Sequence, residues 1–227
     1  MPAVPTPAWQ VVVPVRGTAP SKSRLDLPDT ARERLARAFA RDTVRAVLDA
    51  TAVAEVVVVT AEAARHVFEG MGARVVADPQ PPSLSAAIAT GLAACDPQAP
   101  RAVLLGDLPA LTGAALDEAL SAAAAHGRAV VPDADGTGTT LLTAASGLAH
   151  SPAFGSGSYA RHLAAGYASL ADAAGPRMRS DVDTVADLAR AAELGLGPAS
   201  RRALARIDDP VSAATLPSRG ARTVSGS

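Results

Sequence analysis

The sequence is short of cysteine, of aromatic residues and of an excess of either charge. Its 227 residues include one cysteine, three Phe, two Tyr and one Trp, and 21 Lys and Arg stand against 22 Asp and Glu. A single cysteine excludes a disulfide framework within the chain and an all-cysteine metal site, so we expect a cytoplasmic protein. The balanced charge and the scarcity of aromatic rings disfavour a nucleic-acid partner, which needs basic surfaces and stacking platforms.

Long hydrophobic runs are also missing, and none approaches the roughly 18–20 residues that cross a bilayer. We therefore expect no membrane partner. Residues 1–8 hold three prolines and lack the basic and apolar regions of a secretory signal, which predicts a disordered lead-in. Residues 198–227 mix Arg, Ser, Gly and Ala without a sustained apolar period, which predicts a flexible C-terminal tail. Residues 9–197 are then expected to form a single domain.

What the sequence does contain is an alternation of two hydrophobic periods. Short apolar runs rich in β-branched residues are typical of strands buried on both faces, and they occur at 11–15, 55–60, 74–76, 101–105 and 128–131. Stretches with a helical period lie between and after them, at 29–50, 61–70, 83–95, 112–126 and 184–194. This order predicts an α/β fold with one doubly wound, mostly parallel sheet. Such sheets bind ligands beyond the carboxyl ends of their strands.

The loop after the first predicted strand carries positive charge where a ligand is expected. Arg16, Lys22 and Arg24 lie in it among several hydroxyl residues, a composition that suits phosphate binding. The loop matches neither the P-loop pattern nor the glycine pattern of dinucleotide-binding proteins, which argues against both classes. Taken alone, the segment is equally well interpreted as a solvated basic loop.

Acidic residues follow at two later points. Asp107 comes directly after the fourth predicted strand, and Asp181 and Asp183 precede the last predicted helix. Carboxylates at positions i and i+2 of an extended segment face the same way, so these three side chains would supply oxygen ligands for a Mg²⁺–triphosphate complex. The alternative interpretation is ordinary: a turn aspartate at 107 and a helix N-terminus after 183.

A third polar cluster contains glycine and hydroxyl residues. It spans 132–140 and continues at 154–162, where a helix is expected to begin. Backbone N–H groups released by glycine, together with Ser and Thr hydroxyls, suit a small phosphate or carboxylate, although such segments are more often simple turns. Asp133 and Asp135 lack the spacing and the terminal Glu of a calcium-binding EF-hand loop. His162, beside this cluster, is a candidate substrate contact.

These motifs, taken in order, resemble one enzyme family. The segments are V-P-V-R-G, S-K-S-R-L, L-L-G-D-L-P-A-L, P-D-A-D-G-T-G-T-T-L-L, F-G-S-G-S-Y-A-R-H and R-S-D-V-D-T. Together they are similar to the phosphoenolpyruvate and 2-phospho-L-lactate guanylyltransferases of coenzyme F-420 biosynthesis. That family is a branch of the nucleotide-diphospho-sugar transferase superfamily, and the resemblance covers about residues 9–197. It implies the Rossmann-like fold of that superfamily.

The resemblance implies a role for individual residues. The implied roles are GTP phosphate binding and catalysis for Lys22 and Arg24, Mg²⁺ binding for Asp107, Asp181 and Asp183, and binding of the phosphorylated three-carbon acid for Thr140, Gly155 and Ser158. Two substrate-binding positions depart from the family. Arg16 stands where Lys is frequent, and Ser85 stands where an Asn is expected near the base or ribose of the nucleotide.

The implied reaction is transfer of GMP from GTP to phosphoenolpyruvate or 2-phospho-L-lactate, with release of pyrophosphate. The downstream transferase that consumes the unstable product is an implied partner. Two alternatives stay open at this stage. The G-D-L-P motif is shared with nucleotidyltransferases for molybdopterin or sugar phosphates, and a non-catalytic GTP-binding partner protein would keep the same charged residues.

Overall fold

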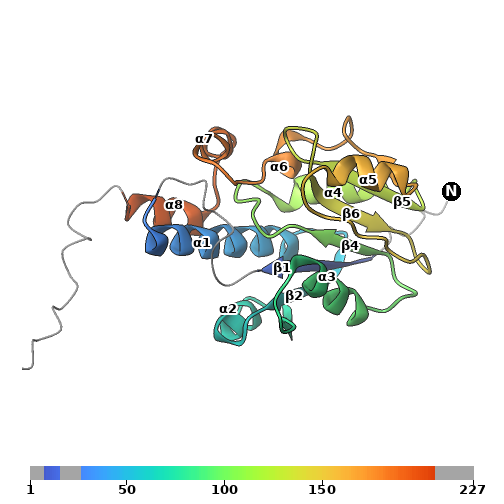
Figure 1. Cartoon of the computed structure of the whole chain (residues 1–227), viewed down its shortest axis with the longest axis horizontal. Coiled ribbons are helices and arrows are strands. Elements are labelled where there is room, and N and C mark those ends of the chain that lie inside the picture. The colour runs from blue at the N-terminus through green and yellow to red at the C-terminus, as the bar shows by residue number, and fades with distance from the viewer. Residues whose placement is uncertain (1–7, 16–26, 208–227) are drawn as a thin grey trace, which may run out of the picture.

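A seven-stranded sheet with helices on both faces forms the part of the chain that the computed structural model describes, residues 8–15 and 27–207 (Figure 1). The strands are β1 (Trp9–Val15), β2 (Val53–Thr60), β3 (Arg74–Ala77), β4 (Arg101–Leu104), β5 (Arg128–Pro132), β6 (Thr139–Ala144) and β7 (Ala168–Ser169). Their order across the sheet is β3-β2-β1-β4-β6-β5-β7. Only β6 is antiparallel to its neighbours among these strands, so the predicted mostly parallel α/β sheet is confirmed.

The helices agree with the predicted ones in most places. They are α1 (Asp29–Leu48), the 3₁₀ turn η1 (Glu62–Ala64), α2 (Arg65–Glu69), α3 (Leu84–Ala93), α4 (Gly113–Ala123), α5 (Ser158–Ala164), α6 (Pro176–Arg179), α7 (Val185–Leu194) and α8 (Pro198–Ala205). Ser83, Thr112 and Thr184 cap α3, α4 and α7 through their hydroxyls. Each cap satisfies a backbone N–H that the first turn of a helix leaves without a partner.

The two faces of the sheet are covered by different helices. Successive side chains of a strand point to opposite faces, so Val11 and Val13 of β1 join the apolar cluster formed with α1 and α4, whereas Val12 joins the cluster formed with α3. The α3 helix packs very close to the sheet at Gly91. A Cβ atom there would lie 2.3 Å from a methyl carbon of Val12, so only glycine allows this approach.

Strand β6 was not predicted, because its threonines were assigned to a polar cluster. All six of its residues are nevertheless buried. The hydroxyl of Thr143 donates to the carbonyl oxygen of Ala129 at 3.3 Å, and that of Thr140 donates to the carbonyl oxygen of Met178 at 2.7 Å. A buried hydroxyl that makes such a bond no longer carries the full cost of leaving water, which explains how a threonine-rich segment forms a central strand.

The predicted flexible tail, which starts at residue 198, begins with a helix. Residues 198–205 form α8, which lies alongside α1 (Figure 1). Asp42 of α1, only 6% exposed, accepts hydrogen bonds from Ala199 N, Ser200 N and Ser200 Oγ at 2.6–2.9 Å. The composition of residues 198–227 could not predict this contact, because the contact depends on the buried carboxylate of Asp42, which lies far away in the chain. Residues 1–7 of the predicted lead-in 1–8 and the part of the predicted tail after 207 lie outside the described residues.

Replacing Asp42 by alanine tests whether this contact holds α8 in place. Asp42→Ala leaves buried N–H and hydroxyl donors of α8 without their acceptor, so we expect the free energy of unfolding to fall by about 2–4 kcal/mol in urea titrations. The control is Glu33→Ala on the same helix, whose side chain is 39% exposed and lies 3.7 Å from Arg37. It should cost less than about 0.5 kcal/mol. Equal losses in the two variants would contradict the account.

Candidate active site

A cavity of about 780 Å³ opens at the carboxyl ends of the parallel strands. Its described lining includes Val15 at the end of β1, Leu105–Asp107 after β4 and Asp133 after β5. The segment before α5 and the start of α7 complete it from the other end of the chain. This is the edge at which open α/β sheets bind ligands, and both acidic segments singled out in the sequence reach it.

The two acidic segments are joined by one backbone hydrogen bond. Val182 N–H donates to the carbonyl oxygen of Asp107 at 3.1 Å. The Val182 side chain is fully buried in the apolar cluster that includes Leu35 and Phe39 of α1. Because alternate residues of an extended segment face opposite ways, burial of Val182 turns Asp181 and Asp183 together towards the cavity, whose lining contains both.

The loop that carries Asp107 is fixed by buried contacts. The Thr43 hydroxyl of α1 donates to Phe39 O at 2.9 Å and accepts from Leu108 N at 3.0 Å. Gly106 passes so close to β1 that a Cβ atom there would lie 3.1 Å from the carbonyl oxygen of Pro14. These contacts hold the half-buried Asp107 at the cavity before any ligand arrives.

The carboxylates of the cavity do not form a ready-made metal centre. Within residues 8–15 and 27–207, no group of three His, Cys, Asp or Glu side chains is arranged to hold a metal ion. Mg²⁺ is commonly bound by one or two carboxylates together with substrate phosphates, and oxygen ligands suit it. Asp107, Asp181 and Asp183 nevertheless all contribute to the lining, and their carboxylates offer the oxygen ligands that Mg²⁺ prefers.

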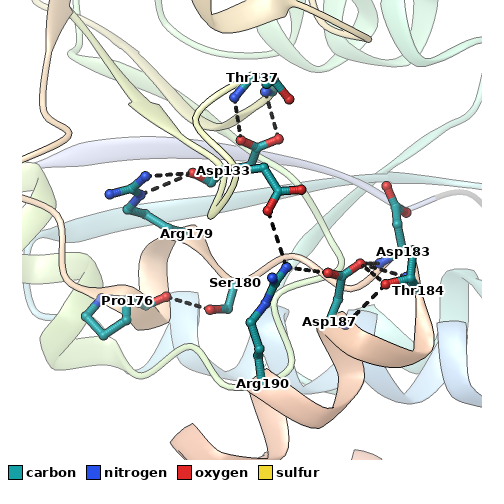
Figure 2. Close-up of polar contacts among 11 residues, drawn as sticks. Asp133, Thr137, Pro176, Arg179, Ser180, Asp183, Thr184, Asp187 and Arg190 are labelled. Atoms are coloured by element: carbon teal, nitrogen blue, oxygen red, sulfur yellow. Dashed lines mark hydrogen bonds and ion pairs between the residues drawn. The ribbon is translucent and has the colours of Figure 1, made fainter.

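The β5–β6 loop is braced from within and from α6 (Figure 2). The Asp133 carboxylate accepts hydrogen bonds from Thr137 N at 2.8 Å and from Gly138 N at 2.7 Å. The backbone carbonyl oxygen of Asp133 accepts two more hydrogen bonds from the Arg179 guanidinium, at 3.0 and 3.1 Å. Asp133 thus shapes one wall of the cavity.

Arg190, which the sequence analysis missed, lies where α7 meets that loop (Figure 2). Its guanidinium pairs with Asp187 of α7 and lies 3.6 Å from Asp135 of the β5–β6 loop. Burial by itself raises the pKa of Asp187, but hydrogen bonds from Thr184 and Asp183 N and the charge of Arg190 outweigh it and lower the pKa. Arg190 follows Asp187 by three residues on a predicted helix, and this spacing in the sequence could have predicted the pair.

The predicted acceptor residues divide into two groups. Gly155 and Ser158 line the cavity, and Gly155 has φ +113°, a conformation that favours glycine. Thr140 is fully buried with its hydroxyl bound to Met178 O, and its neighbour Thr139 lines the cavity instead. The one-residue difference follows from strand geometry, in which neighbours face opposite sides.

The predicted nucleotide contacts are placed less completely. Ser85 is exposed and does not belong to the described lining of the cavity. Its neighbour Leu84 is the residue of α3 that lines the cavity. Arg16, Lys22 and Arg24 lie outside the described residues. Their roles stay predictions.

A buried imidazole is hydrogen-bonded to the cavity-lining residue Thr139. His162 Nε2 accepts a hydrogen bond from Ala153 N at 2.9 Å, and Nδ1 lies 2.9 Å from Thr139 Oγ1. Burial, followed by the charge of Arg161, lowers the pKa of His162 to about 4. The ring is therefore neutral at pH 7.

This low pKa predicts a loss of stability in acid. The folded pKa of His162 lies below the ordinary value of 6.5, so its contribution is complete above pH 6.5 and is lost as the pH falls towards 4. The shift corresponds to roughly 3 kcal/mol. In urea titrations, His162→Asn should lose about 2–3 kcal/mol less than the wild type between pH 7 and pH 4.

The matched control is His126→Asn, which changes an exposed histidine. It shows whether a change from His to Asn by itself alters the stability curve, because this side chain is exposed in the folded protein. Parallel curves for wild type and His162→Asn would refute the assignment of a buried neutral imidazole.

The fold and the cavity together define a nucleotidyltransferase. Residues 32–192 match the family model of the MobA-like NTP transferase domain. A nucleotidyl transferase from Methanothermobacter thermautotroptrophicus is similar in fold, with a TM-score of 0.52 and 22% identity over 81% of this chain and 95% of that protein. So is 4-diphosphocytidyl-2C-methyl-D-erythritol synthase, with a TM-score of 0.56 and 12% identity over 83% and 99%.

Curated relatives narrow the class. The phosphoenolpyruvate guanylyltransferase of Streptomyces coelicolor is 48% identical over 205 residues, which cover 88% of this chain and 97% of that protein. That of Salinispora arenicola is 49% identical over 199 residues, with 85% and 92% covered. The chain belongs to the phosphoenolpyruvate guanylyltransferase family, and the resemblance found from its motifs is confirmed.

No helix among residues 8–15 and 27–207 is both long enough and apolar enough to cross a membrane.

Proposed function

We propose that this protein transfers GMP from GTP to phosphoenolpyruvate and releases pyrophosphate. One observation carries the proposal: a single cavity collects the acidic segments at Asp107 and Asp181–Asp183 and, from another part of the chain, the Gly155–Ser158 segment. A nucleotidyltransferase needs such a division, with one region for the metal-bound triphosphate and one for the acceptor. The names of the curated relatives support a guanine nucleotide and phosphoenolpyruvate as the two substrates.

The proposed chemical step is one in-line displacement. A phosphate oxygen of the acceptor attacks the α-phosphorus of GTP, a new P–O–P bond forms, and the bond between the α-phosphorus and the departing oxygen of pyrophosphate breaks. The attacking phosphate is already ionised at neutral pH, so the step needs no general base. Two anions must meet, and catalysis is then mainly positioning and neutralisation of charge.

Charge neutralisation falls to residues from several segments. In the proposal, Lys22, Arg24 and Arg16 contact the phosphates, and carboxylates from the set Asp107, Asp181 and Asp183 hold Mg²⁺. These carboxylates are half-buried in the cavity lining, and their oxygen atoms are the ligands that Mg²⁺ prefers. When bound with the triphosphate, Mg²⁺ supplies positive charge that stabilises the departing pyrophosphate.

Other predicted residues receive narrower roles. Gly155 and Ser158 are proposed to contact the acceptor. Thr140 is proposed to act by position, since its hydroxyl anchors Met178 at the end of α6. Ser85 is proposed to lie near the base or ribose, one residue from Leu84 on the lining.

The wider setting follows from the family resemblance. We place the reaction in coenzyme F-420 biosynthesis, with the transferase that consumes the guanylylated product as a partner. The lone cysteine, Cys95, is buried, and burial raises its pKa to about 11, which leaves it protonated and inert. A reducing cytoplasm suits such a chain.

Pyrophosphate release tests the proposal directly. Purified protein with GTP, Mg²⁺ and phosphoenolpyruvate should release pyrophosphate, and Asp107→Asn should lower kcat/KM by about 10²–10³-fold because a preorganised charge is lost. The control is Glu118→Gln, an exposed carboxylate of α4 outside the cavity lining, which should retain full activity. Full turnover in Asp107→Asn would remove Asp107 from the site.

The same assay compares acceptors. Phosphoenolpyruvate, 2-phospho-L-lactate and a sugar phosphate are supplied in turn, with the downstream transferase present to consume an unstable product. We expect the highest kcat/KM with phosphoenolpyruvate. Preference for the sugar phosphate, or GTP binding without pyrophosphate release with any acceptor, would contradict the proposed function.

Removal of divalent cations provides a separate test. Dialysis against EDTA should abolish pyrophosphate release, and added Mg²⁺ should restore it, since the carboxylates of the cavity and the triphosphate repel each other without a cation. Asp183→Asn should need more Mg²⁺ for half-maximal activity than Glu118→Gln. Undiminished activity in EDTA would rule out the metal-dependent step.

A further inference from the structure

Three buried polar side chains form a connected chain at the acceptor end of the cavity. Thr139, Ser158 and His162 are 3%, 1% and 0% exposed. Ser158 Oγ lies 3.1 Å from Thr139 Oγ1, which lies 2.9 Å from His162 Nδ1. Thr139 and Ser158 also line the cavity, whereas His162 lies behind them. The proposed chemistry leaves His162 without a direct part in the reaction.

The contacts of His162 determine which of its ring nitrogens carries the proton. Nε2 faces the backbone N–H of Ala153 at 2.9 Å, and a backbone N–H only donates, so Nε2 is the acceptor. In a neutral imidazole the other nitrogen then carries the hydrogen. Nδ1–H therefore donates to Thr139 Oγ1. If Nε2 carried the proton, its N–H would face the N–H of Ala153, and two hydrogen-bond donors would repel each other.

The ring is also held against rotation. Phe154 packs edge-on against the imidazole at a centroid distance of 5.3 Å, and Tyr167 does so from another direction at 5.5 Å. Burial keeps the ring neutral, in keeping with the pKa of about 4. The hydrogen bond from Nδ1 thus has a fixed direction.

The direction of the hydrogen bond from His162 Nδ1 determines how many hydroxyl protons of Thr139 and Ser158 are left to donate. Thr139 and Ser158 carry one O–H group each, and one lone pair of Thr139 Oγ1 accepts the hydrogen bond from His162. One of the two O–H groups is used in the bond between Thr139 and Ser158. One O–H group remains as a donor, and both hydroxyls belong to residues that line the cavity. An anionic oxygen is the group that a fixed donor of this kind prefers.

We propose that His162 is a positioning residue that orients the Thr139–Ser158 hydroxyl pair as a hydrogen-bond donor to an anionic group of the acceptor. The inference rests on the proposed function and deepens it. The acceptor is favoured over GTP because the proposed function gives Ser158 and the nearby Gly155 to the acceptor, whereas it gives the metal-bound triphosphate to Asp107, Asp181 and Asp183. His162 acts through Thr139 and does not touch the substrate.

Two amide substitutions separate this role from a purely structural one. An Asn amide nitrogen takes the place of Nδ1, so His162→Asn keeps the donor to Thr139 and loses the contact with Ala153. His162→Gln places its amide near Nε2, so it keeps the Ala153 contact and loses the donor. We expect KM for phosphoenolpyruvate to rise about 10- to 100-fold in His162→Gln and less than about threefold in His162→Asn. KM for GTP should stay within about twofold in both.

Thr139 offers a second matched pair. Thr139→Val keeps the shape and removes the hydroxyl, and Thr139→Ser keeps the hydroxyl. The first should raise KM for phosphoenolpyruvate about 10- to 100-fold, and the second should stay close to the wild type. Circular dichroism and thermal melting confirm the fold of each variant. Equal acceptor KM values in Thr139→Val and wild type, or a larger defect in His162→Asn than in His162→Gln, would overturn the proposal.

Nitrogen-15 NMR of the histidine side chains gives a readout independent of turnover. At pH 7.5 the wild type should show His162 as the neutral tautomer protonated at Nδ1, and phosphoenolpyruvate added with a non-hydrolysable GTP analogue should shift that resonance. A proton on Nε2, or no response to phosphoenolpyruvate, overturns the positioning role. Wild-type protein that shows both signals but releases no pyrophosphate overturns the proposed function and leaves the positioning role standing.

Discussion

The cavity depends on the backbone hydrogen bond between Val182 N and the carbonyl oxygen of Asp107, at 3.1 Å. It joins the loop after β4 to the segment before α7, two regions far apart in the chain. Burial of the Val182 side chain and the Thr43 bond to the Asp107 loop hold the two partners in place. Charged groups that would repel each other are thus assembled by apolar packing and backbone bonds, so the folded protein bears the cost of assembling them before substrate binds.

The lining of the cavity combines two kinds of polar group, carboxylates and hydroxyls. Near Asp107 the lining is acidic and offers the oxygen ligands that a divalent cation prefers. Near Ser158 it presents hydroxyls whose directions are set by a buried neutral imidazole, His162. The sum of charges over the whole chain is close to zero and reveals neither group. A transferase that brings two anions together requires this separation, because each anion must be neutralised or bound by its own set of groups.

The sequence was sufficient for the features that depend on local pattern. Strongly periodic segments predicted most of the sheet and the helices, and alternation around Val182 placed Asp181 and Asp183 on one side. Features that depend on distant partners escaped prediction. Strand β6 needed bonds from its buried threonines to other segments, α8 needed the Asp42 carboxylate, and the role of Thr139 rather than Thr140 on the cavity wall depends on strand register.

In the proposed reaction, a phosphate oxygen of the acceptor attacks the α-phosphorus of GTP in this cavity. Phosphoenolpyruvate labelled with oxygen-18 in its phosphate group tests it most directly, with both products analysed by mass spectrometry. The expected products are unlabelled pyrophosphate and a guanylylated acceptor that retains all of the label. Label in pyrophosphate, or GDP as the nucleotide product, would contradict the proposed reaction.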